Sequence, residues 1–195
     1  NSKLYPEKTA IVERIPAANT QKQISWNQFF KTACQFANAL KHNGIQKGDK
    51  VVQLMTNSLD WLPLYFGILY TGAWAVPLNF RFESDKILLC TRTAEAKVFI
   101  FGPEFIGRIE AIKPELDEFV TLWLFSGPKD ACPHWATPVQ KFIDDAEHAS
   151  PDTPPKVTLS MEDEAALYFT SGTTGTPKAV LLTHKNLSHA CYLEN

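Results

Sequence analysis

The sequence predicts an α/β protein with a mostly parallel sheet and helices on both faces. Short apolar segments alternate along the chain with segments of helical periodicity, which is typical of parallel strands joined by helical crossovers. The strand-like run Val98–Phe101 is apolar at every position, as expected of a strand covered on both faces. Hydrophobic residues make up 45% and charged residues 21% of the 195 residues, the balance of a folded globular protein.

The first strong element is a helix that begins after Ser25. Ser25 and Gln28 have the spacing of a capping box, and an apolar stripe at helical period follows them. Gly44 is expected to end this helix in the left-handed conformation. Further strands are predicted at 51–55, 75–78, 97–101 and 120–125, and further helices from Asn57 or Ser58 to Tyr70, from Ser84 to Thr91 and over 104–112.

One segment has the length of a membrane span. Trp61 to Phe80 is a run of 20 residues without a charge. Its glycines and prolines favour two buried elements separated by Thr71 and Gly72. A membrane-anchored protein remains the weaker alternative, and we expect at most peripheral membrane association.

The alternation of strand-like and helical segments ends near residue 128. Prolines cluster at 128–138 and again at 148–157, which indicates loops or a linker. We therefore expect an N-terminal α/β subdomain over residues 1–150. Residues 151–195 are expected to form a linker, a strand at 166–169, a polar loop, a strand at 179–183 and a helix capped by Thr183. This second part would begin the next portion of a larger domain.

Composition excludes several classes of protein. The formal charge is −2, from 19 basic and 21 acidic residues, which argues against a nucleic-acid-binding protein. The four cysteines are too widely spaced to indicate a zinc site or a disulfide scaffold, so reduced and mostly buried thiols are expected. The polar start of the chain does not resemble a secretory signal, and a cytoplasmic location is expected.

The segment Thr170–Lys178 carries the most specific signal. Five of its nine residues are Ser or Thr, two are Gly, and it ends in Pro-Lys between two apolar strands. Glycines let successive backbone N–H groups converge on an anion, hydroxyls add donors, and the lysine adds a compact positive charge. Unlike the common P-loop, the segment leads into a strand. The candidate phosphate-binding residues are Thr170, Ser171, Gly172, Thr173, Thr174, Gly175, Thr176 and Lys178.

This segment, followed by Ala179–His184, resembles the phosphate-binding signature of the acyl-adenylate-forming enzymes. Three upstream segments also resemble that family: Ile24–Phe30, Gly48–Val52 and Tyr65–Asn79. Within the family, Pro77–Arg81 looks most like the fatty-acid and aryl-acid CoA ligases. The resemblance covers essentially the whole chain, and it implies the N-terminal part of the family fold.

The resemblance implies an ATP-dependent acid–CoA ligase. Such enzymes form an acyl-adenylate and pyrophosphate from a carboxylic acid and ATP, and then transfer the acyl group to coenzyme A. Lys178 would be the electrostatic clamp on the phosphates. The Mg²⁺ ligands and other motifs of the family are expected downstream, so no metal ligands are assigned here, and the 195 residues alone are expected to be an inactive fragment. An amino-acid adenylation domain of a peptide synthetase and a non-catalytic nucleotide-binding module remain as alternatives.

Other notable residues are expected to have structural roles. Core packing is favoured over an acyl pocket for the aromatic side chains Trp61, Tyr65, Phe66 and Trp74. A local structural role is favoured over acid–base work for His184. We expect Asp144 and Asp145 in a solvated loop and the acidic residues 162–164 in the first turn of a helix.

Overall fold

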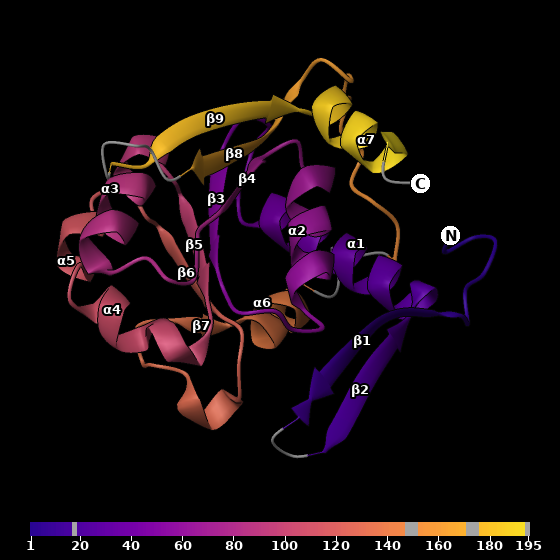
Figure 1. Ribbon diagram of the computed structural model, residues 1–195, viewed down its shortest axis with the longest axis horizontal. Coiled ribbons are helices and arrows are strands. Elements are labelled where there is room, and N and C mark those ends of the chain that lie inside the picture. Colours follow the sequence, from indigo (N-terminus) through magenta and orange to yellow (C-terminus); the bar gives the residue numbers. More distant parts are fainter. Residues whose placement is uncertain (17–18, 147–151, 171–175, 194–195) are drawn as a thin grey trace.

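The computed structural model describes residues 1–16, 19–146, 152–170 and 176–193. Seven strands form one sheet in the order β7-β6-β5-β3-β4-β8-β9, and every neighbouring pair is parallel except β8 and β9 (Figure 1). The strands are β3 (Lys50–Leu54), β4 (Trp74–Pro77), β5 (Val98–Phe101), β6 (Leu122–Phe125), β7 (Thr137–Pro138), β8 (Glu164–Thr170) and β9 (Lys178–Thr183). The mostly parallel sheet is therefore confirmed.

Helices cover both faces of this sheet, as predicted. One face carries α1 (Trp26–His42), α2 (Trp61–Tyr70) and α6 (Val139–Asp145). The other carries α3 (Ser84–Ala94), α4 (Ile106–Glu110) and α5 (Lys113–Leu116), which lie on the opposite side of the strands in Figure 1. Adjacent residues of a strand point to opposite faces. Val51 accordingly packs in the core below α1 and α2, and Val52 in the core below α3.

Helix α1 begins and ends as its sequence predicts. The Gln28 backbone N–H donates to the Ser25 hydroxyl at 3.3 Å, and the Ser25 N–H donates to the Gln28 side-chain oxygen at 2.8 Å. This reciprocal capping box satisfies two donors that the first turn leaves open. Gly44 follows the helix at a φ of 82°, where a side chain would be strained.

The segment from Trp61 to Phe80 forms two elements, α2 and β4, joined through Thr71 and Gly72. Among the described residues, no helix has the length and apolar character needed to cross a membrane. The predicted cap at Asn57 or Ser58 is wrong, because the residue before α2 is Asp60 and it makes no side-chain capping bond.

Carboxylates from elsewhere in the chain hold the backbone just before α2. The Thr56 N–H donates to Glu104 at 3.2 Å, and the Leu59 N–H donates to Glu13 at 3.3 Å. These bonds join positions 46 and 48 residues apart in the chain, so no local pattern predicts them.

Two further helix predictions need correction. Ser84 is the first residue of α3 rather than its cap, and its hydroxyl donates to the Arg108 carbonyl oxygen at 2.9 Å. The helix predicted over 104–112 is shorter and broken: a 3₁₀ turn, η2 (Pro103–Phe105), leads into α4. A separate helix, α5, then starts with Pro114 in its first turn, where proline is tolerated.

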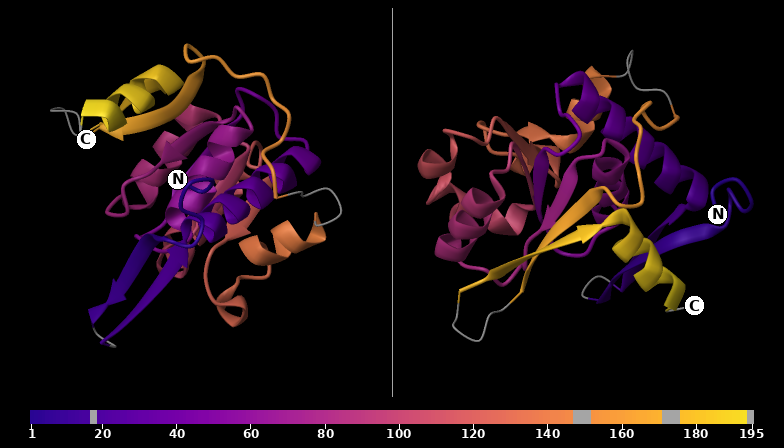
Figure 2. Two further views of the ribbon diagram at one scale, coloured as in Figure 1. Left: turned by 90° about the vertical axis from the view of Figure 1, so that its right-hand side faces the viewer. Right: turned by 90° about the horizontal axis from the view of Figure 1, so that it is seen from above.

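The sequence analysis did not predict the N-terminal hairpin of β1 (Thr9–Ile15) and β2 (Thr20–Ser25), nor α6, β7 and the 3₁₀ turn η3 (Lys129–Ala131). The hairpin is antiparallel and extends away from the main sheet as a separate two-stranded sheet (Figure 2). No residue of either strand is buried, although four of the seven in β1 are half-buried. The β1 sequence runs Ala10–Val12 and then Glu13–Arg14, so it lacks the alternation of apolar and polar residues that marks a strand.

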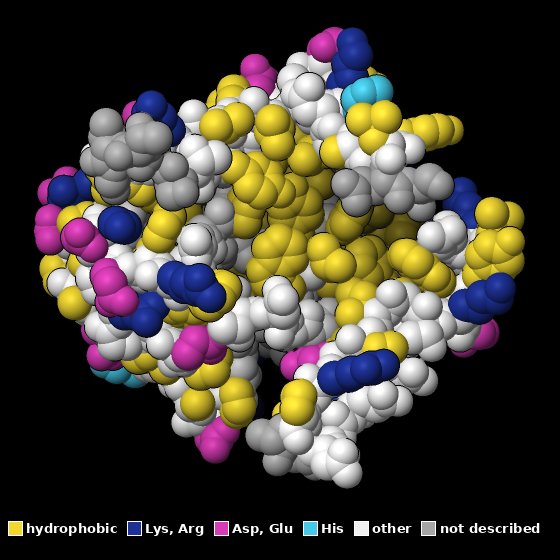
Figure 3. All heavy atoms as spheres, in the orientation of Figure 1, with side chains coloured by type: hydrophobic (Ala, Val, Ile, Leu, Met, Phe, Trp, Pro, Cys, Tyr) yellow, Lys and Arg dark blue, Asp and Glu magenta, His cyan; other side chains and the backbone are white. Residues whose placement is uncertain are grey.

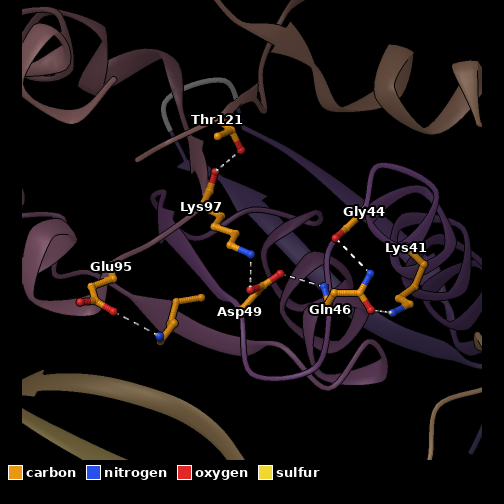
Figure 4. A network of polar contacts seen from close by, with 8 residues as sticks. Lys41, Gly44, Gln46, Asp49, Glu95, Lys97 and Thr121 are labelled. Carbon is orange, nitrogen blue, oxygen red and sulfur yellow. Dashed lines mark hydrogen bonds and ion pairs between the residues drawn. The ribbon is translucent and has the colours of Figure 1, made fainter. Parts of the chain in front are cut away.

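A polar network fastens the amino ends of three central strands (Figure 4). Asp49 accepts the Gln46 N–H at 2.8 Å and forms an ion pair with Lys97 at 2.7 Å. The Lys97 carbonyl in turn accepts the Thr121 hydroxyl at 3.3 Å. Asp49, Lys97 and Thr121 precede β3, β5 and β6, so these contacts fix how the three strands enter the sheet.

Residues 152–193 extend the same sheet, because Ala166 of β8 pairs in parallel with Ala75 of β4. Of the proline-rich segment 148–157, residues 152–157 are irregular chain, and residues 147–151 lie outside the described residues. The four cysteines form no disulfide with one another: Cys34 and Cys90 are buried, Cys132 is half-buried and Cys191 is exposed. Within the described ranges, no group of three or more His, Cys, Asp or Glu side chains is arranged to hold a metal ion.

Candidate functional site

The candidate phosphate-binding segment joins the two strands of the β8–β9 hairpin. The strands predicted at 166–169 and 179–183 are both confirmed, and they pair antiparallel in a register that ends with Thr170 opposite Lys178. The two strands of the hairpin extend beyond the rest of the sheet (Figure 2, right). Five predicted site residues lie outside the described residues: Ser171, Gly172, Thr173, Thr174 and Gly175.

The described residues at the two ends of this segment are close together. The Thr170 hydroxyl lies 3.5 Å from the Lys178 carbonyl oxygen, to which it donates. Thr170, Thr176 and Lys178 are all exposed. The Lys178 ammonium forms no ion pair with any carboxylate in the described part of the chain. Its charge is therefore available to an anionic ligand.

The backbone also agrees with the predicted difference from a P-loop. Lys178 is the first residue of β9, so the segment leads into a strand and not into a helix. The segment begins and ends at one antiparallel residue pair, Thr170 and Lys178. Its backbone N–H groups, hydroxyls and one ammonium are suitable donors for a polyphosphate.

Thr183 ends β9 and caps the following helix, α7 (His184–Leu193), as predicted. Its hydroxyl accepts the Asn186 N–H at 3.2 Å, and its own N–H donates to the Asn186 side-chain oxygen at 2.9 Å. The hairpin and α7 are therefore joined through a fixed turn.

His184 has a structural environment at the base of the hairpin. Its backbone N–H donates to the Asp163 carbonyl oxygen at 3.0 Å. The side-chain Nε2 is buried and has no hydrogen-bond partner among the described residues. Burial lowers the pKa of His184, although the Asp163 carboxylate opposes that shift. A half-buried imidazole whose Nε2 is enclosed agrees with the structural role expected for this residue.

Asp163 lies in a turn that leads into β8, so the helical turn expected for residues 162–164 is wrong. Its carboxylate accepts the Lys47 ammonium at 2.5 Å and the Ser160 N–H at 2.6 Å, and these bonds lower its pKa. The loop expected at Asp144 and Asp145 is also wrong, because both residues belong to α6. Lys47 and Asp163 are far apart in sequence, so their pairing has no local signal.

The aromatic residues expected in the core differ in burial. Tyr65 is buried, Trp61 and Trp74 pack partly buried at the core, and Phe66 of α2 is 37% exposed. The Tyr65 hydroxyl lies 3.1 Å from the hydroxyl of Tyr168 in β8, within hydrogen-bond distance. Sequence analysis assigned Tyr65 to the core and missed this contact, because its partner is 103 residues away.

The fold and the hairpin together define the N-terminal α/β part of an adenylate-forming enzyme. A family model described as AMP-binding enzyme matches residues 1–194, and the chain belongs to this family.

Two curated relatives are similar over most of this chain. Long-chain fatty acid transport protein 6 of Mus musculus is 33% identical over 144 residues, which are 74% of this chain and 23% of that protein. Long-chain-fatty-acid–CoA ligase FadD13 of Mycobacterium tuberculosis is 30% identical over 174 residues, which are 88% of this chain and 32% of that protein. The chain therefore spans between 23% and 32% of the length of these relatives.

A solved structure has the same fold. The anthranilate CoA ligase AuaEII in complex with anthranoyl-AMP superposes with a TM-score of 0.76 at 29% identity, covering 84% of this chain and 30% of that one.

Proposed function

We propose that the protein containing this chain activates a carboxylic acid with ATP and then transfers the acyl group to coenzyme A. In the first step a carboxylate oxygen attacks the α-phosphate, forming an acyl-adenylate and releasing pyrophosphate. In the second step the thiol of coenzyme A displaces AMP and forms a thioester. The observation that carries this proposal is the AMP-binding family match over residues 1–194, which includes the Gly/Thr/Lys segment.

We further propose a fatty or aryl acid as the substrate. FadD13 is named as a long-chain fatty-acid ligase and AuaEII as an anthranilate ligase, and both names include CoA. These names favour a CoA ligase over an amino-acid adenylation domain. A module that binds the nucleotide without turnover is the remaining alternative, and the exchange experiment below distinguishes it.

The loop between β8 and β9 is proposed to hold the β- and γ-phosphates of ATP. In this assignment Gly172 and Gly175 let the backbone approach the phosphates, and Lys178 neutralises charge on the leaving pyrophosphate. The hydroxyl donors are Thr170, Ser171, Thr173, Thr174 and Thr176. Two observations support it: the Lys178 ammonium is exposed and forms no ion pair with a described residue, and Thr170 pairs with Lys178. No general base is assigned, because a carboxylic acid is already ionised at pH 7.

Groups outside this chain are proposed to complete the site. We assign residues 1–150 to an N-terminal α/β subdomain and 151–195 to the linker and the start of the next part of the domain. The Mg²⁺ and adenine contacts would come from later residues, and the 195 residues alone would not adenylate. The observation that supports this is that the matched part of the chain spans 32% of FadD13.

Carboxylate-dependent exchange of labelled pyrophosphate into ATP tests the function on the intact gene product. Exchange with fatty or aryl acids, followed by thioester formation when coenzyme A is added, is the expected result. Exchange with amino acids alone would assign the protein to the amino-acid-activating enzymes. If the protein binds ATP but shows no exchange with any acid, the CoA-ligase proposal is rejected. The protein would then be a module that binds the nucleotide without turnover.

A further inference from the structure

We propose that Tyr65 is a positioning residue for the phosphate-binding loop, because its hydroxyl holds β8 against α2 two residues before Thr170. This inference rests on the proposed function of the loop. Tyr65 belongs to α2 and Tyr168 to β8, and their hydroxyl oxygens are 3.1 Å apart.

The hairpin has few other restraints near its loop. The register between β8 and β4 consists of the single pair Ala166 and Ala75. Burial decreases along β8: residues 165–167 are buried, 168 and 169 are half-buried and Thr170 is exposed. Strand β9 pairs only with β8 and forms an edge of the sheet. Contacts made by residues 168 and 169 therefore set where the loop begins.

Of the two tyrosines, Tyr65 is the fixed partner. It is 6% exposed in the core cluster below the sheet, and its ring stacks on Trp61 with 5.4 Å between centroids. Its other side meets Phe66 edge-on at 6.0 Å. Burial and the bond to Tyr168 raise the pKa of Tyr65, so its hydroxyl stays protonated at physiological pH. Tyr168 is only half-buried, so we infer that the rigid helix restrains the strand.

The hydrogen bond between Tyr65 and Tyr168 is a directional contact in surroundings that are otherwise apolar. Figure 3 shows hydrophobic side chains gathered over the face formed by α2 and the hairpin. Phe169 packs against the core on the opposite face of the sheet. Such contacts resist separation but do not fix register, whereas a hydrogen bond depends on distance and angle.

An ion pair holds the other end of the hairpin, and it cannot replace the Tyr65–Tyr168 hydrogen bond. Lys47 binds Asp163 just before β8 starts, five residues before Tyr168. Among the described residues, the Tyr65–Tyr168 bond is the last hydrogen bond from a β8 side chain to an element outside the β8–β9 hairpin, because the later Thr170 bond goes to β9. Its loss would leave the base of the hairpin attached and free the end that carries Thr170.

The test is the affinity of the intact gene product for inorganic tripolyphosphate with Mg²⁺, measured by titration calorimetry. Tyr65→Phe and Tyr168→Phe each remove one hydroxyl, and each is expected to weaken binding about three- to tenfold. The double variant is expected to bind no more weakly than either single variant, because both changes remove the same bond. In pyrophosphate exchange, the KM for ATP should rise while the KM for the acid stays unchanged.

Tyr70→Phe is the matched control. Tyr70 lies on the same helix, and its hydroxyl makes no hydrogen bond to a described residue, so less than a twofold change is expected. A purely structural role would lower the unfolding temperature of Tyr65→Phe and leave the affinity of the folded protein unchanged. That result would overturn the inference, as would additive effects in the double variant. If Tyr65→Phe does not fold, Tyr168→Phe alone decides. A wild-type protein that fails to bind tripolyphosphate would instead overturn the assigned role of the loop.

Discussion

Thr170 and Lys178 face each other as the last residue pair of the β8–β9 hairpin, and the Thr170 hydroxyl donates to the Lys178 carbonyl oxygen. This pairing fixes the two ends of the seven-residue segment 171–177 relative to each other. Among the described residues, no carboxylate forms an ion pair with the Lys178 ammonium.

Replacing Lys178 tests this electrostatic role. Lys178→Ala is expected to slow adenylation more than it weakens ATP binding, because the charge on pyrophosphate grows as the bond to the α-phosphate breaks. A charged hydrogen bond contributes about 1.5–3 kcal/mol, so the rate should fall roughly 10- to 100-fold. Single-turnover adenylation and equilibrium ATP binding measure the two effects separately.

Lys156→Ala is the control for removing one exposed lysine and should change neither quantity. Equal losses in rate and in binding for Lys178→Ala would indicate that the ammonium binds the ground state and the transition state equally. If neither the adenylation rate nor the affinity for ATP falls, Lys178 is not part of the phosphate site.

The close approach of α1 and α2 predicts a steric effect at Gly67. A Cβ at this position would lie 2.9 Å from the Ala33 carbonyl oxygen and 2.9 Å from the Phe36 ring. Gly67→Ala should therefore destabilise the protein by roughly 1–2 kcal/mol, although alanine has the better helix propensity. Urea unfolding measures the change.

Gly107→Ala in α4 isolates the propensity effect. A Cβ there meets no atom within 4 Å, so a gain of about 0.5–1 kcal/mol is expected. If Gly67→Ala is as stabilising as Gly107→Ala, the two helices do not pack as closely as described.

Burial of His184 predicts a pH dependence of stability. Its pKa is lowered from the usual 6.5, so the unfolded state takes up a proton first as the pH falls from 7 towards 5. The free energy of unfolding should therefore decrease over that range, and His184→Gln should reduce this slope. His189→Gln, at an exposed position of α7, controls for the loss of one histidine.

Asp163 acts in a different pH range. Its bonds to Lys47 and Ser160 lower its pKa below the usual 3.8, so the stability that they provide is lost only in more acidic solution. An unchanged slope between pH 7 and 5 in His184→Gln would mean that His184 is not buried as described.

The cysteines should differ in reactivity towards a thiol reagent. Burial raises the pKa of Cys34 to about 11 and that of Cys90 to about 12, so few thiolates form at neutral pH. Cys191 is exposed and should be labelled first, followed by the half-buried Cys132. Mass spectrometry of the natively labelled protein gives the order, and rapid labelling of Cys90 would contradict the described core.

The central sheet was predictable because residues close together in sequence mark its strands and the helix before them. Each of β3, β5 and β6 is a short apolar run, and the capping box of Ser25 and Gln28 marks the start of α1 within four residues. The N-terminal hairpin gave no such signal because β1 does not alternate between apolar and polar residues, and the start of α2 was misplaced because distant carboxylates hold the preceding backbone.

The amino-acid sequence by itself determined the alternation of strands and helices in the central part of the sheet, the two-sided burial of that sheet and the Gly/Thr/Lys signature between two strands. These properties depend on side-chain type at fixed local spacing. Only the tertiary structure decided that Tyr65 contacts Tyr168, that Lys47 pairs with Asp163 and that Gly67 admits the backbone of α1. Such contacts join residues that only the folded sheet brings together, since the chain between them can follow many paths until the core is packed.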